Sequence, residues 1–482
     1  MSSLDDLCLD AAFLYRLITR WFRADRVQTL PDESELNNEP HRRIAVFIPL
    51  WREHRIIGKM LEHNLASCRY EPCDFFIGTY PNDPETVAAV RAAEWRYPNV
   101  HLSMCPHDGP TSKADCLNWI FQSLVLYEEQ HGIRYEVVVT HDAEDVIHPD
   151  SLPLINHFIA HYDMVQVPVL PIGTAPGEIT HGLYCDEFAE FQSKDIPVRQ
   201  MWGGFLPSNG VGTGYSRRIL EKLAEAHSNR VFESVCLTED YENGYRIHAL
   251  GGSQIFLPLQ YPREKLVATR EYFPRTFRAA VRQRTRWTMG IALQGWERHG
   301  WRVPLRQLYW FWRDRKGLVG NLVAPAANVL FLYGLATWIL SRTRAELWQF
   351  GAPLHAIAWL CWPALLLTLL HLAVRVLCVR NVYGWALAAG VPFRAMWGNW
   401  INLLATVSAI YRYLAARMHG RPLVWLKTEH MYPNRAALAS LEICFQLVTP
   451  GEFEELAHEY LAGSQATARL NLPVVSESTL QQ

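Results

Sequence analysis

"IAVFIPL", residues 44–50, is an unbroken run of apolar and β-prone residues. A strand buried on both faces of a sheet has this composition, whereas a strand with one wet face alternates apolar and polar residues. Helical and β-prone segments then alternate to about residue 262; the helical ones are 56–68, 84–97 and 114–130, and the β-prone ones are "DFFIGTY", "VHLSMC" and "YEVVVTHD". This alternation predicts an α/β domain with a doubly wound, mostly parallel sheet.

Polar residues follow three of the predicted strands directly, which matters because ligands of such sheets bind beyond the carboxyl ends of the strands. The first strand is followed by Arg52 and Glu53, the second by Asn82 and Asp83, and the fourth by Asp142, Glu144 and Asp145. Acidic side chains at a strand end often do no more than interact with water. Carboxylates at the first and third positions after a buried strand, however, also suit a hard divalent cation held against phosphate oxygens.

Two long uncharged runs follow the α/β region. Residues 317–341 and 347–374 contain no Asp, Glu, Lys or Arg, and each exceeds the roughly 20 residues that a membrane-spanning helix needs. A third apolar region, 381–411, contains Pro392 and Arg394, so a kinked span, a hairpin and an interfacial helix all remain open. Basic residues before the first run and after the third region predict a cytoplasmic N-terminal part and a cytoplasmic C-terminus.

The start of the chain, "MSSLDDLCLD", is acidic where a signal peptide would be basic, so we expect no signal peptide. Residues 11–22 indicate a short amphipathic helix, lying on the inner leaflet or packed on the domain. The predicted organisation is an N-terminal segment (1–42), a cytoplasmic domain (43–316), a transmembrane region (317–412) and a cytoplasmic tail (413–482).

The overall composition excludes little. Lys plus Arg is 46 and Asp plus Glu is 48, so charge gives no argument for a nucleic-acid partner, and we expect none. The ten cysteines form no CxxC pair, which fits a reducing compartment and argues against a zinc site.

Three further motifs carry chemistry. "TED", Thr238 to Asp240, opens a helical pattern; it is typical of a helix cap, but a carboxylate at that place is also suited to act as a general base. "SNGVGTGYSRR", 208–218, is glycine-rich and precedes a helix, as an anion or sugar loop would.

The third motif is "RQRTRW", 282–287. On a helix, Gln283, Arg286 and Trp287 share one face. A guanidinium and an amide there suit a diphosphate, and the indole suits a sugar ring. The competing interpretation is a basic amphipathic helix that touches anionic lipid.

The acidic strand end, "TED", "QRTRW" and the apolar helices, in this order, resemble the family-2 membrane glycosyltransferases of the cellulose synthase type. More narrowly, "YPNDPET", "GPTSKADCLN", "HDAEDVIHP", "LTEDYENG" and "VRQRTRWTMGIALQGW" resemble the bacteriophage adsorption protein B family, over about residues 4–433. The resemblance implies a nucleotide-sugar-binding domain of the GT-A type and a bacterial inner-membrane enzyme connected with an exported polysaccharide. It also implies a single in-line displacement with inversion at the anomeric carbon, from a donor for which the superfamily favours uridine.

Site roles follow from the same resemblance, position by position. The residues that would bind the donor are Glu53, Asp83, Lys113, Asp115, Gln283 and Arg286. Asp142 and Glu144 would bind Mg²⁺ or Mn²⁺, and Asp240, beside Glu239, would be the catalytic base. Trp287 and Thr238 would bind the acceptor. The third position of the metal motif is a glutamate where the superfamily more often has aspartate, so Asp145 stays open as the second metal ligand.

The implied partners are the donor, a glycan or lipid-linked acceptor, membrane lipid and an outer-membrane export partner. Cyclic di-GMP binding is in doubt, because the tail "SLEICFQLVTPGEFEELAHEYL" departs from the expected signature. Two alternatives to a polysaccharide-extending enzyme stay open. One is a non-processive transferase that adds one sugar to a lipid carrier, and the other is a catalytically idle membrane receptor or assembly factor.

Overall fold

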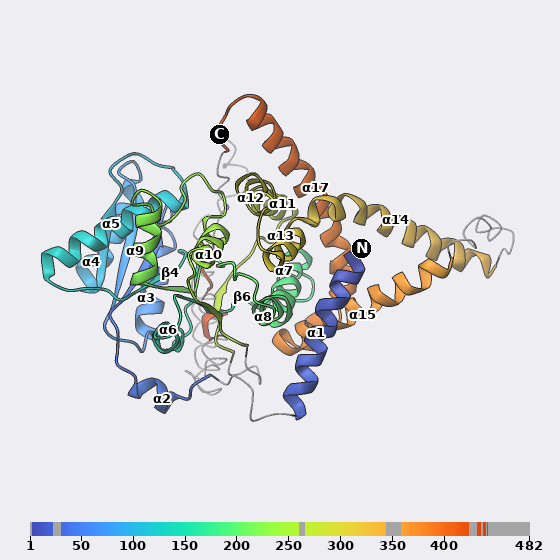
Figure 1. Ribbon diagram of the computed structural model, residues 1–482, viewed down its shortest axis with the longest axis horizontal. Coiled ribbons are helices and arrows are strands. Elements are labelled where there is room, and N and C mark those ends of the chain that lie inside the picture. The colour runs from blue at the N-terminus through green and yellow to red at the C-terminus, as the bar shows by residue number, and fades with distance from the viewer. Residues whose placement is uncertain are drawn as a thin grey trace, which may run out of the picture.

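A mixed sheet with helices on both faces forms one end of the molecule, and two long helices project from the other end (Figure 1). The computed structural model describes residues 2–22, 30–259, 266–343, 358–423, 431–434, 437–439 and 441. The seven strands of the main sheet lie in the order β3-β2-β1-β4-β7-β5-β8. The predicted fold class, a doubly wound and mostly parallel sheet, is therefore confirmed.

The apolar run that opened the sequence forms the centre of the parallel half. β1 (Ile44–Pro49) pairs in parallel with β2 (Cys73–Thr79) and β4 (Val137–Thr140), and β3 (Val100–Met104) pairs with β2. Alternate residues of β1 enter two separate cores: Val46 and Ile48 face one side, and Ala45 and Phe47 face the other. Burial on both faces explains why this strand has no polar positions.

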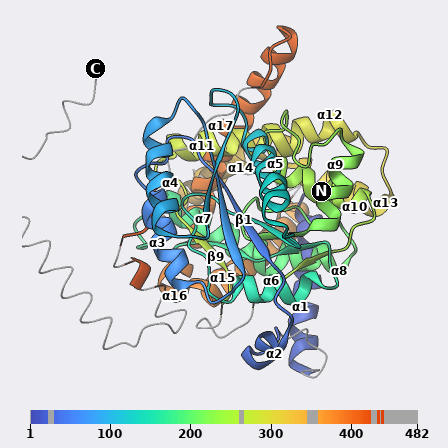
Figure 2. The ribbon, with the colours of Figure 1, turned by 90° about the vertical axis from the view of Figure 1, so that its left-hand side faces the viewer.

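Helices cover both faces of the sheet (Figure 2). The first core contains residues of α3 (Ile57–Ser67), α4 (Pro84–Arg96) and α6 (Ser151–Ile159). The second contains residues of α5 (Lys113–His131) and α9 (Arg217–Ala226). The helices α3, α4 and α5 agree with their predicted ranges to within one residue at either end.

The other half of the sheet is built from short strands. β7 (Thr213–Ser216) is antiparallel to both β4 and β5 (Met164–Gln166), and β8 (Gln254–Phe256) pairs in parallel with β5. A separate pair is formed by β6 (Val169–Pro171) and β9 (Thr269–Glu271). β9 also bridges to Val146, just after the acidic end of β4.

A helical layer lies beside the carboxyl edge of the sheet. Its first members are α7 (Ile179–Glu190), the π-helical segment η2 (Phe191–Asp195), α8 (Ile196–Met201) and α10 (Glu239–Ala249). They are followed by α11 (Phe277–Trp287), the π-helical segment η4 (Thr288–Gln294), α12 (Gly295–His299) and α13 (Leu305–Arg315). The two remaining helices of the N-terminal part are α1 (Ser2–Phe22), longer than the predicted 11–22, and α2 (Glu33–Asn38).

Helices α14 (Gly317–Ser341) and α15 (Ala358–Tyr383) project from the body (Figure 1). Within the described residues, two helical stretches are long and apolar enough to cross a membrane, Leu305–Thr337 and Trp362–Tyr383. The third apolar region consists of the short α16 (Trp385–Ala388) and the single helix α17 (Val391–Met418), whose Pro392 lies in the first turn. The interpretation of that region as a hairpin is therefore wrong. Residues 442–482, which include most of the predicted tail module, lie outside the described residues.

Candidate active site

A cavity of about 560 Å³ opens at the carboxyl edge of the sheet. Its walls come from the loops after β1 and β4, from the start of α10 and from α11. It extends as far as Asp314 of α13 and Arg375 of α15. Of the residues proposed from the sequence, the structure brings ten to this one cavity: Glu53, Lys113, Asp142, Glu144, Thr238, Glu239, Asp240, Gln283, Arg286 and Trp287.

The carboxylates of the acidic loop after β4 point in two directions, two towards the cavity and one into the protein. Asp142 and Glu144 line the cavity. Asp145 is fully buried behind them; its Oδ2 accepts a hydrogen bond from the backbone N–H of Asp142 (3.0 Å) and lies 2.7 Å from Nδ1 of His141. Burial raises the pKa of Asp145. The structure therefore places Asp145 as a brace of the loop and leaves Glu144 as the carboxylate that faces the cavity beside Asp142.

Lys113, the first residue of α5, faces the acidic loop from the opposite side. Its Nζ lies 2.6 Å from Oδ1 of Asp142 and 3.4 Å from the carbonyl oxygen of Gly210, to which it donates. Burial alone would lower the pKa of Lys113, but the carboxylates of Asp142, Glu239 and Asp240 raise it above its usual value. The side chain therefore stays charged and holds together the acidic groups of two separate motifs.

The "TED" motif enters the cavity at the start of α10. Thr238 occupies the position before the helix but makes no side-chain cap, so the capping role that the sequence allowed is not the one adopted. Burial raises the pKa values of both Glu239 and Asp240, and the neighbouring Asp240 carboxylate helps to raise that of Glu239 to about 7. Oδ1 of Asp240 accepts a hydrogen bond from the backbone N–H of Tyr241 (2.7 Å). Both acids are therefore easier to protonate than usual, and the hydrogen bond from Tyr241 fixes the orientation of Asp240.

Helix α11 presents Gln283, Arg286 and Trp287 to the cavity on one face, as their spacing predicts. Arg284 does not line the cavity, and its Nη2 lies 2.6 Å from Oε2 of Glu187. The indole of Trp287 packs at 6.1 Å, centroid to centroid, against Tyr184. One arginine thus fixes α11 to α7, while the arginine two residues later faces the cavity.

Two residues proposed for donor binding do not line the cavity, Asp83 and Asp115. Asp83 is buried, and its Oδ2 accepts a hydrogen bond from the backbone N–H of Arg52 (2.6 Å), a residue held at a left-handed φ of 56°. Oδ2 of Asp115 accepts a hydrogen bond from the hydroxyl of Thr111 (2.8 Å), which does line the cavity. Both carboxylates fix the backbone or side chain of a neighbour; their donor-binding role remains a prediction.

Glu271 is the main cavity residue that sequence reasoning missed. It ends β9 and lines the cavity next to the acidic loop. Burial, and then the nearby carboxylates of Asp145, Glu144 and Asp142, raise its pKa well above the usual value. β9 is three residues long, too short for a periodic pattern, so only the placement of β9 beside the loop after β4 reveals this acid.

Comparison with known sequences shows the family to which the chain belongs. The model of the family described as "glycosyltransferase like family 2" matches residues 40–290, more than half of the chain, and the chain belongs to this family. It is also 35% identical over 455 residues to bacteriophage adsorption protein B of Escherichia coli K12 and to bacteriophage N4 adsorption protein B of E. coli O157:H7. These alignments cover 90% of the chain but 61% of the length of either relative.

Solved structures show weaker similarity. A mannosyltransferase from Pyrobaculum calidifontis, PcManGT, in complex with GDP-Man and Mn²⁺, has 17% sequence identity and a TM-score of 0.43, with coverage of 86% of this chain and 99% of its own. TarS of S. aureus (residues 1–349) has 10% identity and a TM-score of 0.37, with coverage of 79% and 92%.

Proposed function

We propose that this protein is an inverting, metal-dependent glycosyltransferase of the bacterial inner membrane that extends a surface or exported polysaccharide from a nucleotide sugar. The observation that carries the proposal is the placement of Asp142, Asp240 and Arg286 on the walls of one cavity. These side chains belong to three motifs far apart in the sequence, and a donor diphosphate and an acceptor hydroxyl need all three. UDP-linked hexoses or N-acetylhexosamines are the donors to test first.

The residues around the acidic loop fit a divalent cation. Asp142, Glu144 and Glu271 offer carboxylate oxygens, the donors that Mg²⁺ and Mn²⁺ prefer. Lys113 lies beside Asp142 and close enough to Glu271 to lower its pKa in part, and a dication would stabilise the charged form of the carboxylates that gather there. Asp142 and Glu144 would hold the ion, which when bound would neutralise charge on the donor diphosphate.

The chain's own residues account for the remaining steps. Asp240 takes the proton from the acceptor hydroxyl as its oxygen attacks the anomeric carbon and the bond from that carbon to the diphosphate breaks. Arg286 and Gln283 donate hydrogen bonds to the departing diphosphate, whose growing charge they stabilise. The face of Trp287 orients the acceptor sugar by stacking. Glu239 has a pKa of about 7, so it is partly protonated near neutral pH. Glu239 and Asp240 therefore do not both carry a full negative charge before Asp240 accepts the proton of the acceptor hydroxyl.

The extent of the cavity supports the proposed membrane location, and the identity of the acceptor is a question for experiment. It reaches Arg375 within a helix that is apolar and long enough to span a membrane. A growing glycan or a lipid-linked acceptor that approached from the side of the proposed membrane would meet this end of the cavity. A non-processive transferase that adds one sugar to a lipid carrier is therefore the alternative to test.

Purified protein in detergent tests the proposal with a panel of nucleotide sugars, Mg²⁺ and Mn²⁺. We expect one donor to release nucleoside diphosphate, and Asp240→Asn to reduce that release by about 10²- to 10⁴-fold while donor binding persists. Glu242→Gln, a change on the same helix at a side chain that pairs with His299, keeps most of the activity. Product length separates a polymerase from a single-sugar transferase. Absence of donor binding would instead favour an idle receptor.

A further inference from the structure

The three carboxylates of the N-terminal helix α1 face the protein. Asp5 is buried, and its carboxylate contacts the phenol of Tyr309, the guanidinium of Arg313 and, at 2.6 Å, Nζ of Lys316. Oδ1 of Asp6 lies 2.8 Å from Nζ of Lys316. Two of the helix's carboxylates are thus neutralised by cations of α13 and of the turn that follows it.

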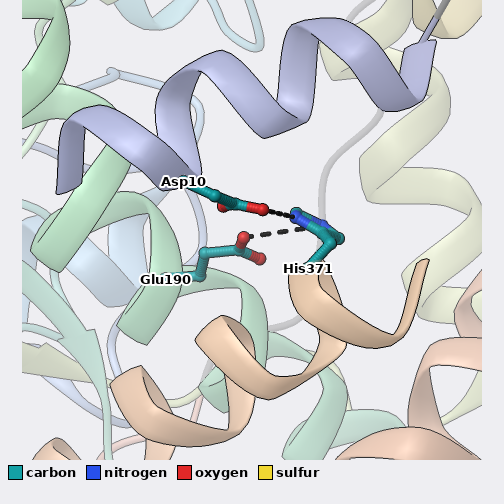
Figure 3. A group of neighbouring side chains, drawn as sticks. All are labelled: Asp10, Glu190 and His371. Atoms are coloured by element: carbon teal, nitrogen blue, oxygen red, sulfur yellow. Dashed lines mark hydrogen bonds and ion pairs between the residues drawn. The ribbon is translucent and has the colours of Figure 1, made fainter. Parts of the chain in front are cut away.

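The third carboxylate of α1 joins an ionic cluster (Figure 3), one member of which, Glu190, also lines the cavity. Asp10, Glu190 of α7 and His371 of α15 converge there, and Nδ1 of His371 lies 3.1 Å from Oδ2 of Asp10. Nζ of Lys194 lies 2.6 Å from Asp10 and 2.5 Å from Glu190. Because that ammonium already holds the place between the carboxylates, the cluster is an ion-pair junction between α1, α7 and α15 rather than a metal site.

The outward face of α1 is apolar. Leu4, Cys8, Ala11, Tyr15 and Ile18 are all exposed, and their spacing of four, three, four and three residues puts them on one stripe of the helix. Leu4 is 60% exposed, Tyr15 65% and Ile18 55%. A helix on a water-facing surface carries its charges outward and its apolar stripe inward. In α1 the three carboxylates face inward and the apolar stripe faces outward, which is typical of a helix whose outer surroundings are lipid.

We propose that the stripe Leu4–Cys8–Ala11–Tyr15–Ile18 is a lipid-contacting surface, with α1 lying across the base of α14 and α15 at the boundary between headgroups and acyl chains. α1 packs against α15 near Val374 and Cys378, and it crosses the base of the projecting pair in Figure 1. Earlier along the same helix, α15 exposes Leu365, Leu366 and Leu369, so the helix against which α1 packs has an apolar exposed surface of its own within a candidate span. This inference rests on the proposed membrane location of α14 and α15.

A bimane label on Cys8 tests the proposal in the full chain reconstituted into phosphatidylcholine nanodiscs. Cys68, Cys361 and Cys444 are replaced by serine; the other described cysteines, Cys8 excepted, are buried. Two control labels are placed in the same background with Cys8→Ser. Trp95→Cys reports on water, because Trp95 is 89% exposed on α4, and Leu366→Cys reports on the candidate span, where Leu366 is 67% exposed.

Quenching by nitroxide-bearing lipid is compared with quenching by aqueous iodide at each label. We expect the Cys8 label to follow the Leu366→Cys label, with lipid quenching several-fold above that at Trp95→Cys. If the Cys8 label follows Trp95→Cys while Leu366→Cys stays lipid-quenched, the inference is overturned and the membrane location stands. If both follow Trp95→Cys, the membrane location fails as well. Excimer emission from pyrene at Cys8 would mean that a second copy covers the stripe, which also overturns the proposal.

Discussion

At the scale of single residues, both acids of the "TED" motif are buried with raised pKa values, and Glu239 carries the testable consequence. Its pKa of about 7 in the folded state exceeds the ordinary 4.5 because of burial and the Asp240 charge. Between these pH values the folded state binds the proton more than the unfolded state does, so the free energy of unfolding falls as pH rises. Glu239→Gln removes this penalty. The variant should gain melting temperature over the wild type as pH rises through this window, with no further gain above it.

Melting in detergent with EDTA present, from pH 4 to 8, checks this expectation. Glu242→Gln is the control of opposite sign, because burial alone would raise the pKa of Glu242 but His299 and Arg298 hold it below the ordinary value. That stabilisation is present above the ordinary pKa and is lost as pH falls through the lowered one. Glu242→Gln should therefore lower the melting temperature at pH 8 and have less effect at acid pH. Equal pH dependence in both variants would contradict the assignment for Glu239.

At the scale of elements, the junction of α11 with η4 sets the position of the "TED" motif. Gly290 lies within η4, where an added Cβ would stand 2.4 Å from Oγ1 of Thr238. Gly290→Ala should displace Thr238 and the acids after it and reduce transfer by about 100-fold, the typical effect of a misplacement of about 1 Å. Gly295→Ala is the matched control, because its nearest neighbouring atom would be 3.7 Å away. Steady-state transfer rates of the two variants check this, and equal rates would disprove it.

The junction of α17 with α7 depends on a buried ion pair. Nε and Nη2 of Arg394 each lie 2.7 Å from an oxygen of Asp186. Burial raises the pKa of Asp186 to about 6 despite Arg394. A charged Asp186 carboxylate without its arginine partner would therefore destabilise the folded state. Arg394→Leu should destabilise the protein by about 3–5 kcal/mol.

Adding Asp186→Leu to that variant should restore much of the loss, since the unpaired charge is then gone. The free energy of unfolding by denaturant, measured for both single variants and the double variant, supplies the comparison. A double variant no more stable than Arg394→Leu would show that packing, rather than the lone carboxylate, dominates.

Elements with long, regular patterns were predictable from the sequence, and those whose form depends on a distant partner were not. β1 and α5 followed from apolar runs and helical spacing, and Gln283, Arg286 and Trp287 reach one cavity because helical geometry alone fixes their common face. By contrast, the three-residue β9 carries Glu271 to the site only through its pairing with β6 and its bridge to Val146. Asp83 follows a strand as Asp142 does, yet it does not line the cavity, and its carboxylate accepts a hydrogen bond from the backbone of Arg52.

At the scale of the whole molecule, the cavity lies between two parts that contact it from opposite sides. Lys113 and Asp142 belong to the sheet half, whereas Arg286 and Trp287 belong to the helical layer that leads into α14 and α15. A nucleoside diphosphate that spans the cavity would contact both parts, so its binding should raise the melting temperature of the whole chain. At a concentration 100 times its Kd the stabilisation is about 2.7 kcal/mol.

The cation makes this whole-molecule prediction specific. Because Asp142 and Glu144 repel an anionic diphosphate, UDP or GDP alone should shift the melting temperature little, and the diphosphate with Mn²⁺ should shift it far more than the two separate shifts combined. Asp142→Asn should abolish the joint shift because it removes a metal ligand. Arg286→Gln should reduce the joint shift because it removes a hydrogen-bond donor to the diphosphate from the opposite wall of the cavity. Asp145→Asn distinguishes a metal ligand from a residue that holds the loop in place. It leaves the cavity-facing carboxylates Asp142 and Glu144 unchanged, so part of the melting-temperature shift with diphosphate and Mn²⁺ together should remain. A full diphosphate shift in EDTA would mean that Lys113 and Arg286 hold the diphosphate without a metal ion, and metal dependence would be wrong.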